Sequence, residues 1–205
     1  MENTMTMDNV VAWDRYMGLK EADLVRAAQK GDLEAFNQLV ILYQDRIYTL
    51  ALRILGDEDS AEDITQEVFL TAYRSLPRFQ NGSLRSWLYR IGTNACYDEL
   101  RRRKRRPLQP LEDENGEEAK PFQLSNFPEP VSLPEKEVER HELEQVVQQA
   151  LNRLDADQRA VVVLIDLHDL DYSEAAHILG VPLGTVKSRL ARARLQLRNL
   201  LSEHK

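Results

Sequence analysis

Apolar residues recur every three to four positions along most of the chain, and the alternation typical of strands is absent. This spacing predicts amphipathic helices, and capping residues place their ends. Asp32 and Ser83 are suited to begin helices, and Gly31, Gly56 and Gly180 to end them. The pattern predicts an all-α fold with helices over about 21–29, 32–56, 57–76, 83–106, 136–154, 155–167, 171–179 and 184–198.

The stretch from residue 171 to residue 198 predicts two helices joined by a tight turn. Asp171 and Glu174 form a capping-box pattern at the start, and Gly180 followed by Val181-Pro182 ends the first helix and redirects the chain. The second helix has an apolar stripe made of Val186, Leu190, Ala193 and Leu197.

Charge on the second helix of this pair is of one sign, with five basic and no acidic residues between Gly184 and Arg198. An amphipathic hairpin with a solvated basic face would share that composition. The capping box, the turn residues and the one-signed charge together favour a helix-turn-helix whose second helix lies in the major groove of DNA.

The 205 residues carry a net charge of −7, which is unusual for a DNA-binding protein until the charge is located. Residues 107–135 contain seven acidic residues, one basic residue and six of the eight prolines. Such a segment cannot form a core and is typical of a linker. We therefore predict an N-terminal arm over 1–20, a first helical domain over 21–106, an acidic linker over 107–135 and a second helical domain over 136–205.

Three features of the first domain indicate binding surfaces. Asp63, Gln66 and Glu67 form a polar patch beyond the first helical turn, and either a partner surface or a solvated face explains it. The six consecutive basic residues 101–106 exceed what a helix end requires, which favours phosphate binding. Phe79 lies in a loop beside Gln80 and Asn81 and indicates a small pocket, whereas Trp87 falls on an apolar stripe and is expected in the core.

Several function classes find no support. The single cysteine, Cys96, excludes an internal disulfide and a thiolate metal cluster, and we expect it to be buried and inert. The four histidines form no ligand pattern, and neither a nucleophilic triad nor a glycine-rich phosphate loop is present, so we expect no enzyme activity, metal or cofactor. Without an apolar run of 18 residues or a secretory signal, no membrane insertion and a cytoplasmic location are expected.

Four stretches, in order, resemble the bacterial sigma factors of the extracytoplasmic function group, which have only domains two and four. The resemblance covers about residues 21–106 and 136–202. It rests on QKGDLEAFNQLVILYQDRIYTLALRILGD, DSAEDITQEVFLTAYRSLPRF, SWLYRIGTNACYDELRRRKRR and LDADQRAVVVLIDLHDLDYSEAAHILGVPLGTVKSRLARAR. The segment GTVKSRL is close to the family's recognition helix.

The resemblance implies roles for the residues singled out above. Those that would contact the clamp helices of the largest subunit of core RNA polymerase are Asp63, Gln66 and Glu67. Those that would capture a flipped base of the −10 element or hold the single strand beside it are Phe79, Gln80, Asn81, Ser83, Asn94, Asp98, Arg101, Arg102 and Arg105. Those that would bind the −35 element as duplex DNA are Thr185, Lys187, Ser188, Arg189 and Arg192.

The implied function is promoter recognition and transcription initiation, in which this chain binds and the polymerase performs the chemistry. The implied partners are core RNA polymerase, promoter DNA and an anti-sigma factor. A helix-turn-helix repressor is the alternative, and it would bind duplex DNA tightly without polymerase.

Overall fold

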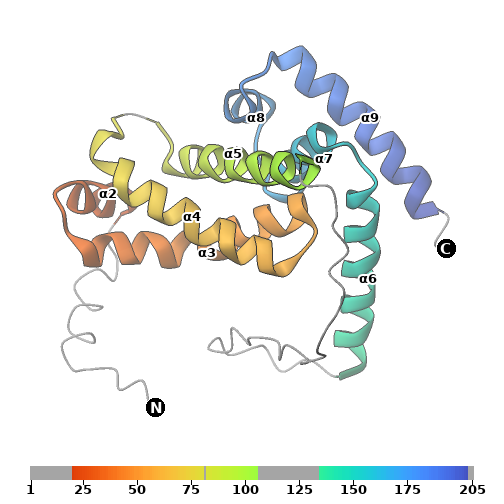
Figure 1. The fold of residues 1–205 in the computed structure, drawn as a ribbon, viewed down its shortest axis with the longest axis horizontal. Helices are drawn as coiled ribbons and strands as arrows, with labels where there is room; N and C mark the ends of the chain where they lie inside the picture. Colours follow the sequence, from red (N-terminus) through yellow and green to blue (C-terminus); the bar gives the residue numbers. More distant parts are fainter. Residues whose placement is uncertain (1–19, 81, 106–133, 203–205) are drawn as a thin grey trace.

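The computed structural model describes residues 20–80, 82–105 and 134–202, and in every part of these ranges the regular elements are helices (Figure 1). Predictions that concern the arm over 1–19, Asn81, the segment 106–133 and residues 203–205 lie outside the described residues. The elements are α2 (Glu21–Gln29), α3 (Leu33–Leu55), α4 (Glu58–Ser75), the 3-10 turn η1 (Leu76–Arg78), α5 (Leu84–Arg105), α6 (Pro134–Asn152), α7 (Ala156–Val162), the π-helical turn η2 (Val163–Leu167), α8 (Tyr172–Leu179) and α9 (Leu183–Ser202). The predicted all-α fold is confirmed.

Local chemistry sets the helix ends of the first unit, α2 to α5. The Asp32 carboxylate accepts hydrogen bonds from the amides of Glu34 and Ala35, both at 3.1 Å. Gly56 ends α3 in the left-handed region, with φ of 86°, where a side chain would be strained. The helix predicted to run to residue 76 ends at Ser75, and Pro77 lies within the following 3-10 turn.

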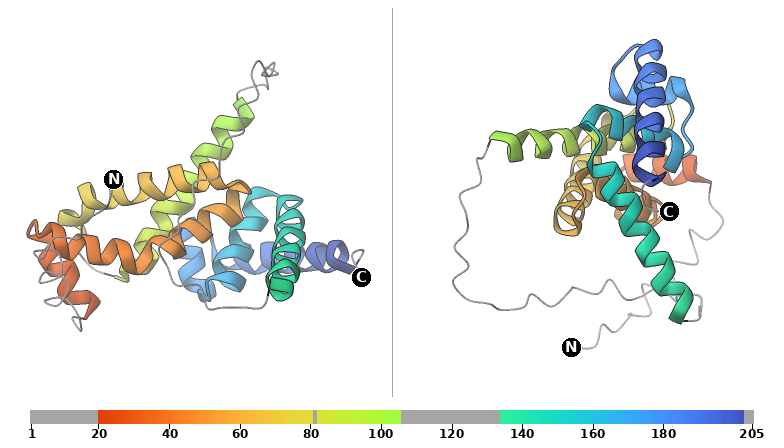
Figure 2. Two further views of the ribbon diagram at one scale, coloured as in Figure 1. Left: turned by 90° about the horizontal axis from the view of Figure 1, so that it is seen from below. Right: turned by 90° about the vertical axis from the view of Figure 1, so that its right-hand side faces the viewer.

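The core of the first unit lies between α3, α4 and α5, and α2 packs on the end of α3 (Figures 1 and 2). Gly92 allows the close approach of α5, because a Cβ there would lie 3.1 Å from Leu50 Cδ2. Cys96 is buried, as predicted, and burial raises the pKa of its thiol to about 12, so the thiolate is not formed near neutral pH. Trp87 is half-buried and packs against the core, so it lies at the edge of the core in which it is predicted.

The second unit consists of α6 to α9, and α9 packs against α7, α8 and the end of α6. Buried Val186, Leu190 and Ala193 form the predicted stripe of α9. Arg159, on α7, is 9% exposed and donates to the carbonyl oxygens of Asn152 at 2.9 Å and Leu154 at 3.1 Å. It thereby satisfies carbonyls at the end of α6 that the helix itself leaves without partners.

The two units pack against each other and share one continuous apolar cluster, although the sequence predicts two domains joined by a linker. Arg159 Nη1 donates to the carbonyl oxygen of Ile54, in α3, at 2.6 Å. Tyr89, in α5, is 1% exposed, and its hydroxyl lies 3.0 Å from Nδ1 of His168. Glu174 of α8 accepts from Arg85 at 3.3 Å. Views from two directions show α8 lying over α5 (Figures 1 and 2).

The histidine at this junction makes stability depend on pH. Burial lowers the pKa of His168 from 6.5 to about 4, and Arg46 and Arg85 act in the same direction while Asp169 opposes them. The packed state therefore favours the neutral ring, and its stability is complete above pH 6.5 and falls as the pH drops towards 4. We expect wild type to lose about 1.4 kcal/mol of unfolding free energy more than His168→Gln between pH 8 and pH 5.5. Urea unfolding at the two pH values measures this, and equal losses would contradict it.

Candidate nucleic-acid interface

The helix-turn-helix has the geometry that its sequence predicts. The Asp171 carboxylate accepts from the amide of Glu174 at 2.7 Å, and the Glu174 carboxylate accepts from the amide of Asp171 at 3.2 Å. Gly180 adopts φ of 63° between α8 and α9. Because the apolar stripe of α9 faces inward, Lys187, Ser188 and Arg192 are exposed, and Thr185 and Arg189 are half-buried.

Two arginines of α9 already have carboxylate partners. Arg189 pairs with Asp157 of α7, and Arg194 Nε donates to Asp166 at 3.0 Å. Asp157 also accepts from the hydroxyl of Tyr97, in α5, and burial together with this carboxylate raises the pKa of Tyr97. A single carboxylate therefore connects α9 to α5. Sequence reasoning misses this contact because the three residues lie far apart in the chain.

The polar patch of α4 is exposed and borders a groove. Asp63, Gln66 and Glu67 all face solvent. The groove between α4 and α5 has a volume of about 440 Å³ and places Asp63 and Glu67 on one wall with Arg102 and Arg105 on the other. The structure thus brings together two sets of residues that the sequence assigns to different partners.

The basic end of α5 is partly neutralised by its own helix and by α4. Arg101 pairs with Asp98 at 2.5 Å, and Arg102 pairs with Glu99 at 2.6 Å. Burial opposes the change, but hydrogen bonds from Arg103 and Arg102 hold the pKa of Glu99 below its ordinary value. Within residues 82–105 the exposed Arg105 has no carboxylate partner, and Arg106 lies outside the described residues.

Arg103 has a structural part that the sequence does not reveal. Its guanidinium pairs with Asp57 at 2.7 Å and with Glu99 at 2.9 Å, and it also donates to Ser60. Burial raises and the hydrogen bonds lower the pKa of Asp57, with a net decrease. Arg103 therefore joins the end of α5 to the start of α4. The run of consecutive basic residues in the sequence indicates instead a side chain that projects freely into solvent.

The loop between α4 and α5 carries an aromatic pair. The ring centroids of Phe79 and Trp87 lie 5.0 Å apart, with 40° between the planes. Phe79 is half-buried, and Gln80 and Ser83 are exposed. The hydroxyl of Ser83 accepts from the amide of Ser86 at 3.3 Å, in agreement with its predicted capping position.

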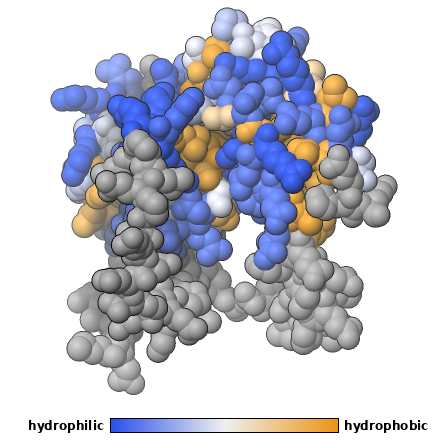
Figure 3. Space-filling view, turned by 45° about the vertical axis from the view of Figure 1, so that its right-hand side comes forward, coloured by the Kyte–Doolittle hydropathy of each residue, from blue (hydrophilic) through white to orange (hydrophobic). Residues whose placement is uncertain are grey.

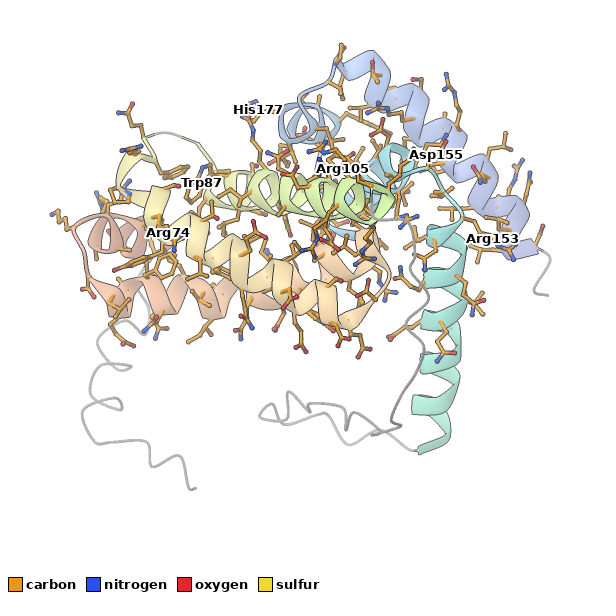
Figure 4. All side chains as sticks on the ribbon, in the orientation of Figure 1. Arg74, Trp87, Arg105, Arg153, Asp155 and His177 are labelled. Carbon is orange, nitrogen blue, oxygen red and sulfur yellow. The ribbon has the colours of Figure 1, made fainter. Side chains whose placement is uncertain are left out.

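One side of α5 links this loop to the basic end. Positions 87, 94, 98, 101 and 105 are separated by three, four or seven residues, so their side chains share one helix face. Asn94, Asp98, Arg101 and Arg105 are exposed along it, and Trp87 and Arg105 mark its two ends (Figure 4). From residue 87 to residue 105 the face is roughly 27 Å long, enough for several nucleotides of a single strand.

Other kinds of site find no support in the part of the chain that the structure describes. No group of three or more histidine, cysteine, aspartate or glutamate side chains there could hold a metal ion. None of its helices combines the length and the apolar character needed to span a membrane. On the face shown in Figure 3 hydrophilic residues predominate, and the apolar ones form separate patches between them.

Comparison with known proteins identifies the family. The model of Sigma-70 region 2 matches residues 39–106, and that of Sigma-70 region 4 matches residues 144–197. The RNA polymerase sigma-H factor of Pseudomonas aeruginosa is 37% identical over 176 residues, covering 85% of this chain and 90% of the relative. The extracytoplasmic function RNA polymerase sigma-E factor of Escherichia coli K12 is 38% identical over 88% of this chain and 94% of its own length. The chain belongs to the extracytoplasmic function sigma factors.

Solved structures agree with this assignment. The sigma factor RpoE of Bartonella quintana, in a complex with the anti-sigma factor NepR, matches with a TM-score of 0.61 and 31% identity, over 82% of this chain and 96% of that one. A sigma factor gives RNA polymerase its promoter specificity at transcription initiation, which is the function that the sequence resemblance implies. The repressor alternative finds no support. The match to region 2 begins within α3, at residue 39, and continues to Arg106. Helix α2 precedes residue 39 and therefore lies outside the match.

Proposed function

We propose that three separate sets of residues in this sigma factor bind the polymerase, the −10 element and the −35 element. The chief support is the outward face of α5, which runs from the aromatic pair in the loop to the basic end of the helix. The α4 patch of Asp63, Gln66 and Glu67 contacts the clamp helices of the largest polymerase subunit. The loop from Phe79 to Ser83 and the outward face of α5 bind the −10 element. The exposed residues of α9 bind the −35 element as duplex DNA.

The −10 proposal follows from what a single strand requires. A flipped base costs a few kcal/mol of stacking, which a shaped pocket can recover selectively. Phe79 and Trp87 offer aromatic surface at one end of α5, and Asn94 offers an amide that can both donate and accept. Towards the other end, Arg101 and Arg102 are positioned to exchange the carboxylates of Asp98 and Glu99 for phosphates.

The −35 proposal assigns base and phosphate contacts to the first half of α9. Lys187, Ser188 and Arg192 are exposed there, and no described carboxylate pairs with Lys187 or Arg192. Arg189 must leave Asp157 to reach DNA, and this exchange is feasible because the pair is partly exposed. Thr185 lies at the start of the helix, the part that points into the major groove in this motif.

Binding both promoter elements requires the two units to separate. Arg189 and Tyr97 share the Asp157 carboxylate, so the two DNA-binding helices are neighbours in this structure. Elements about 25 base pairs apart are separated by roughly 85 Å along duplex DNA. The 28 residues from 106 to 133 span at most about 100 Å when extended, so the connection permits that separation. The packed arrangement is therefore a closed state that opens on the polymerase.

Regulation by an anti-sigma factor is part of the same proposal. The matched RpoE structure contains one, and this chain resembles RpoE over most of its length. An anti-sigma factor that binds the closed state would keep the −10 and −35 surfaces too close together for a promoter. We place this activity in the cytoplasm, with no cofactor and with catalysis left to the polymerase.

Run-off transcription with core RNA polymerase on genomic fragments tests the proposed function. We expect discrete start sites that depend on this protein, and we expect Lys187→Ala/Arg189→Ala to reduce them at least about tenfold, because each lost contact to a base or phosphate weakens binding by about 1 kcal/mol or more.

Arg198→Ala is the matched control, since Arg198 is exposed near the far end of the same helix. Absence of new transcripts with the wild-type protein would overturn the proposed function. Equal loss in the control and the double variant would instead overturn the assignment of the −35 residues.

A further inference from the structure

Helix α2 touches the loop that we assign to the −10 element, although it lies outside the matched sigma region. The contact is made by Gln29, the last residue of α2. Its side-chain Nε2 donates to the carbonyl oxygen of Leu76 at 3.2 Å and to the carbonyl oxygen of Phe79. Figure 1 shows α2 beside the connection between α4 and α5.

The backbone that carries Gln29 is itself held in place. Leu24, Val25 and Ala28 are buried on the inner face of α2. Near the start of the helix, the Tyr43 hydroxyl of α3 donates to the Glu21 carboxylate. These contacts at both ends of a nine-residue helix leave Gln29 little freedom to move relative to α3, so its amide is a fixed reference point for the loop.

The two accepting carbonyls lie at the two ends of the η1 turn. The amide of Phe79 donates back to the Leu76 carbonyl at 3.0 Å, and the backbone becomes extended at Phe79, with φ of −69° and ψ of 113°. Beyond that point Gln80 is exposed and the next helix begins only at Leu84. Among the described residues, the carbonyl of Phe79 is therefore the last hydrogen-bonded group of the turn.

We propose that Gln29 is a positioning residue for −10 recognition, which sets the direction in which the backbone at Phe79 and Gln80 leaves the η1 turn. This inference rests on the proposed function. With its two hydrogen bonds in place, the Phe79 ring stays against Trp87, and Phe79 and Gln80 are presented to a flipped base in one orientation. Without them the carbonyls turn to water and Phe79 can adopt other orientations. Discrimination between bases then decreases, while binding to polymerase, made through α4, does not.

The test compares Gln29→Met and Gln29→Glu with the wild type. Methionine preserves length and removes the donor, whereas glutamate places a carboxylate against two carbonyl oxygens. Lys30→Met is the matched control, because Lys30 is the next residue and is exposed, and no hydrogen bond from its side chain to the described loop residues is found. Each protein is assembled with core polymerase and titrated with labelled single-stranded oligonucleotides that carry the −10 sequence mapped by run-off transcription, either intact or with one base replaced.

We expect the affinity ratio between intact and altered oligonucleotides to fall about fivefold in Gln29→Met and further in Gln29→Glu, as the loss of one or two hydrogen bonds predicts. Polymerase affinity and binding of −35 duplex by the holoenzyme should stay within about twofold. An unchanged ratio in both variants, or an equal decrease in Lys30→Met, would overturn the inference. If wild-type protein yields no transcripts at all, the proposed function fails first and separately.

Discussion

Arg159→Leu is expected to lower the free energy of unfolding by about 3 kcal/mol. The guanidinium donates to three main-chain carbonyls, those of Ile54, Asn152 and Leu154, at 2.6 to 3.1 Å. Leucine would leave all three acceptors without this donor, two of them in a buried place and the third, on Asn152, partly buried. A partial gain offsets the loss, because burial lowers the pKa of Arg159 and its Nε has no described partner, so the charged group itself is costly there.

The loss of three charge-assisted hydrogen bonds costs more free energy than is gained by removing one buried charge, so the net effect of the substitution is destabilising. Urea unfolding followed by circular dichroism measures the difference. Arg153→Leu is the control, because Arg153 is exposed and makes no described side-chain hydrogen bond. Arg159→Lys should fall between the two, since a single ammonium cannot reproduce the planar fork of the guanidinium. A change below about 1 kcal/mol in Arg159→Leu would contradict this account.

Glu67→Lys is expected to weaken binding to core RNA polymerase about 100-fold. Glu67 is exposed beyond the first turn of α4, on the patch that we assign to the polymerase clamp. Reversing a charge at the centre of an interface replaces an attraction with a repulsion, which costs several kcal/mol. In the free protein the same lysine would face Arg102 and Arg105 across the groove, but these side chains are exposed and can turn away.

Asp45→Lys provides the comparison for Glu67→Lys. Asp45 is also exposed, and the change in charge is identical, but it lies on α3. Affinity is measured by fluorescence anisotropy of labelled sigma factor with core enzyme, and thermal unfolding checks that both variants stay folded. If the two variants bind polymerase equally well, the assignment of α4 to the clamp is wrong.

Local sequence determines much of this protein. The caps at Asp32 and Asp171 and the left-handed glycines at 56 and 180 are as predicted, because these features depend on residues within one helical turn of each other. The helix-turn-helix and the family were also predictable, since the order of four motifs carries them. Trp87 packs against the core, as its place on the apolar stripe predicts, but its contact with the Phe79 ring has no signal in the sequence.

Tertiary structure alone decides which charges are available and how the two units meet. The basic run at the end of α5 predicts free cations, yet Arg103 is bound to Asp57, 46 positions earlier in the chain. Neither the hydrogen bond from the Gln29 side chain to Leu76 nor the hydrogen bond from the Arg159 side chain to Ile54 in α3 has a signal in the sequence. Hydrophobic periodicity shows that one face of a helix is buried, but it does not show which element packs on that face. The periodicity depends on residues that are close along the chain, whereas the packing partner is determined by residues that are close only in space.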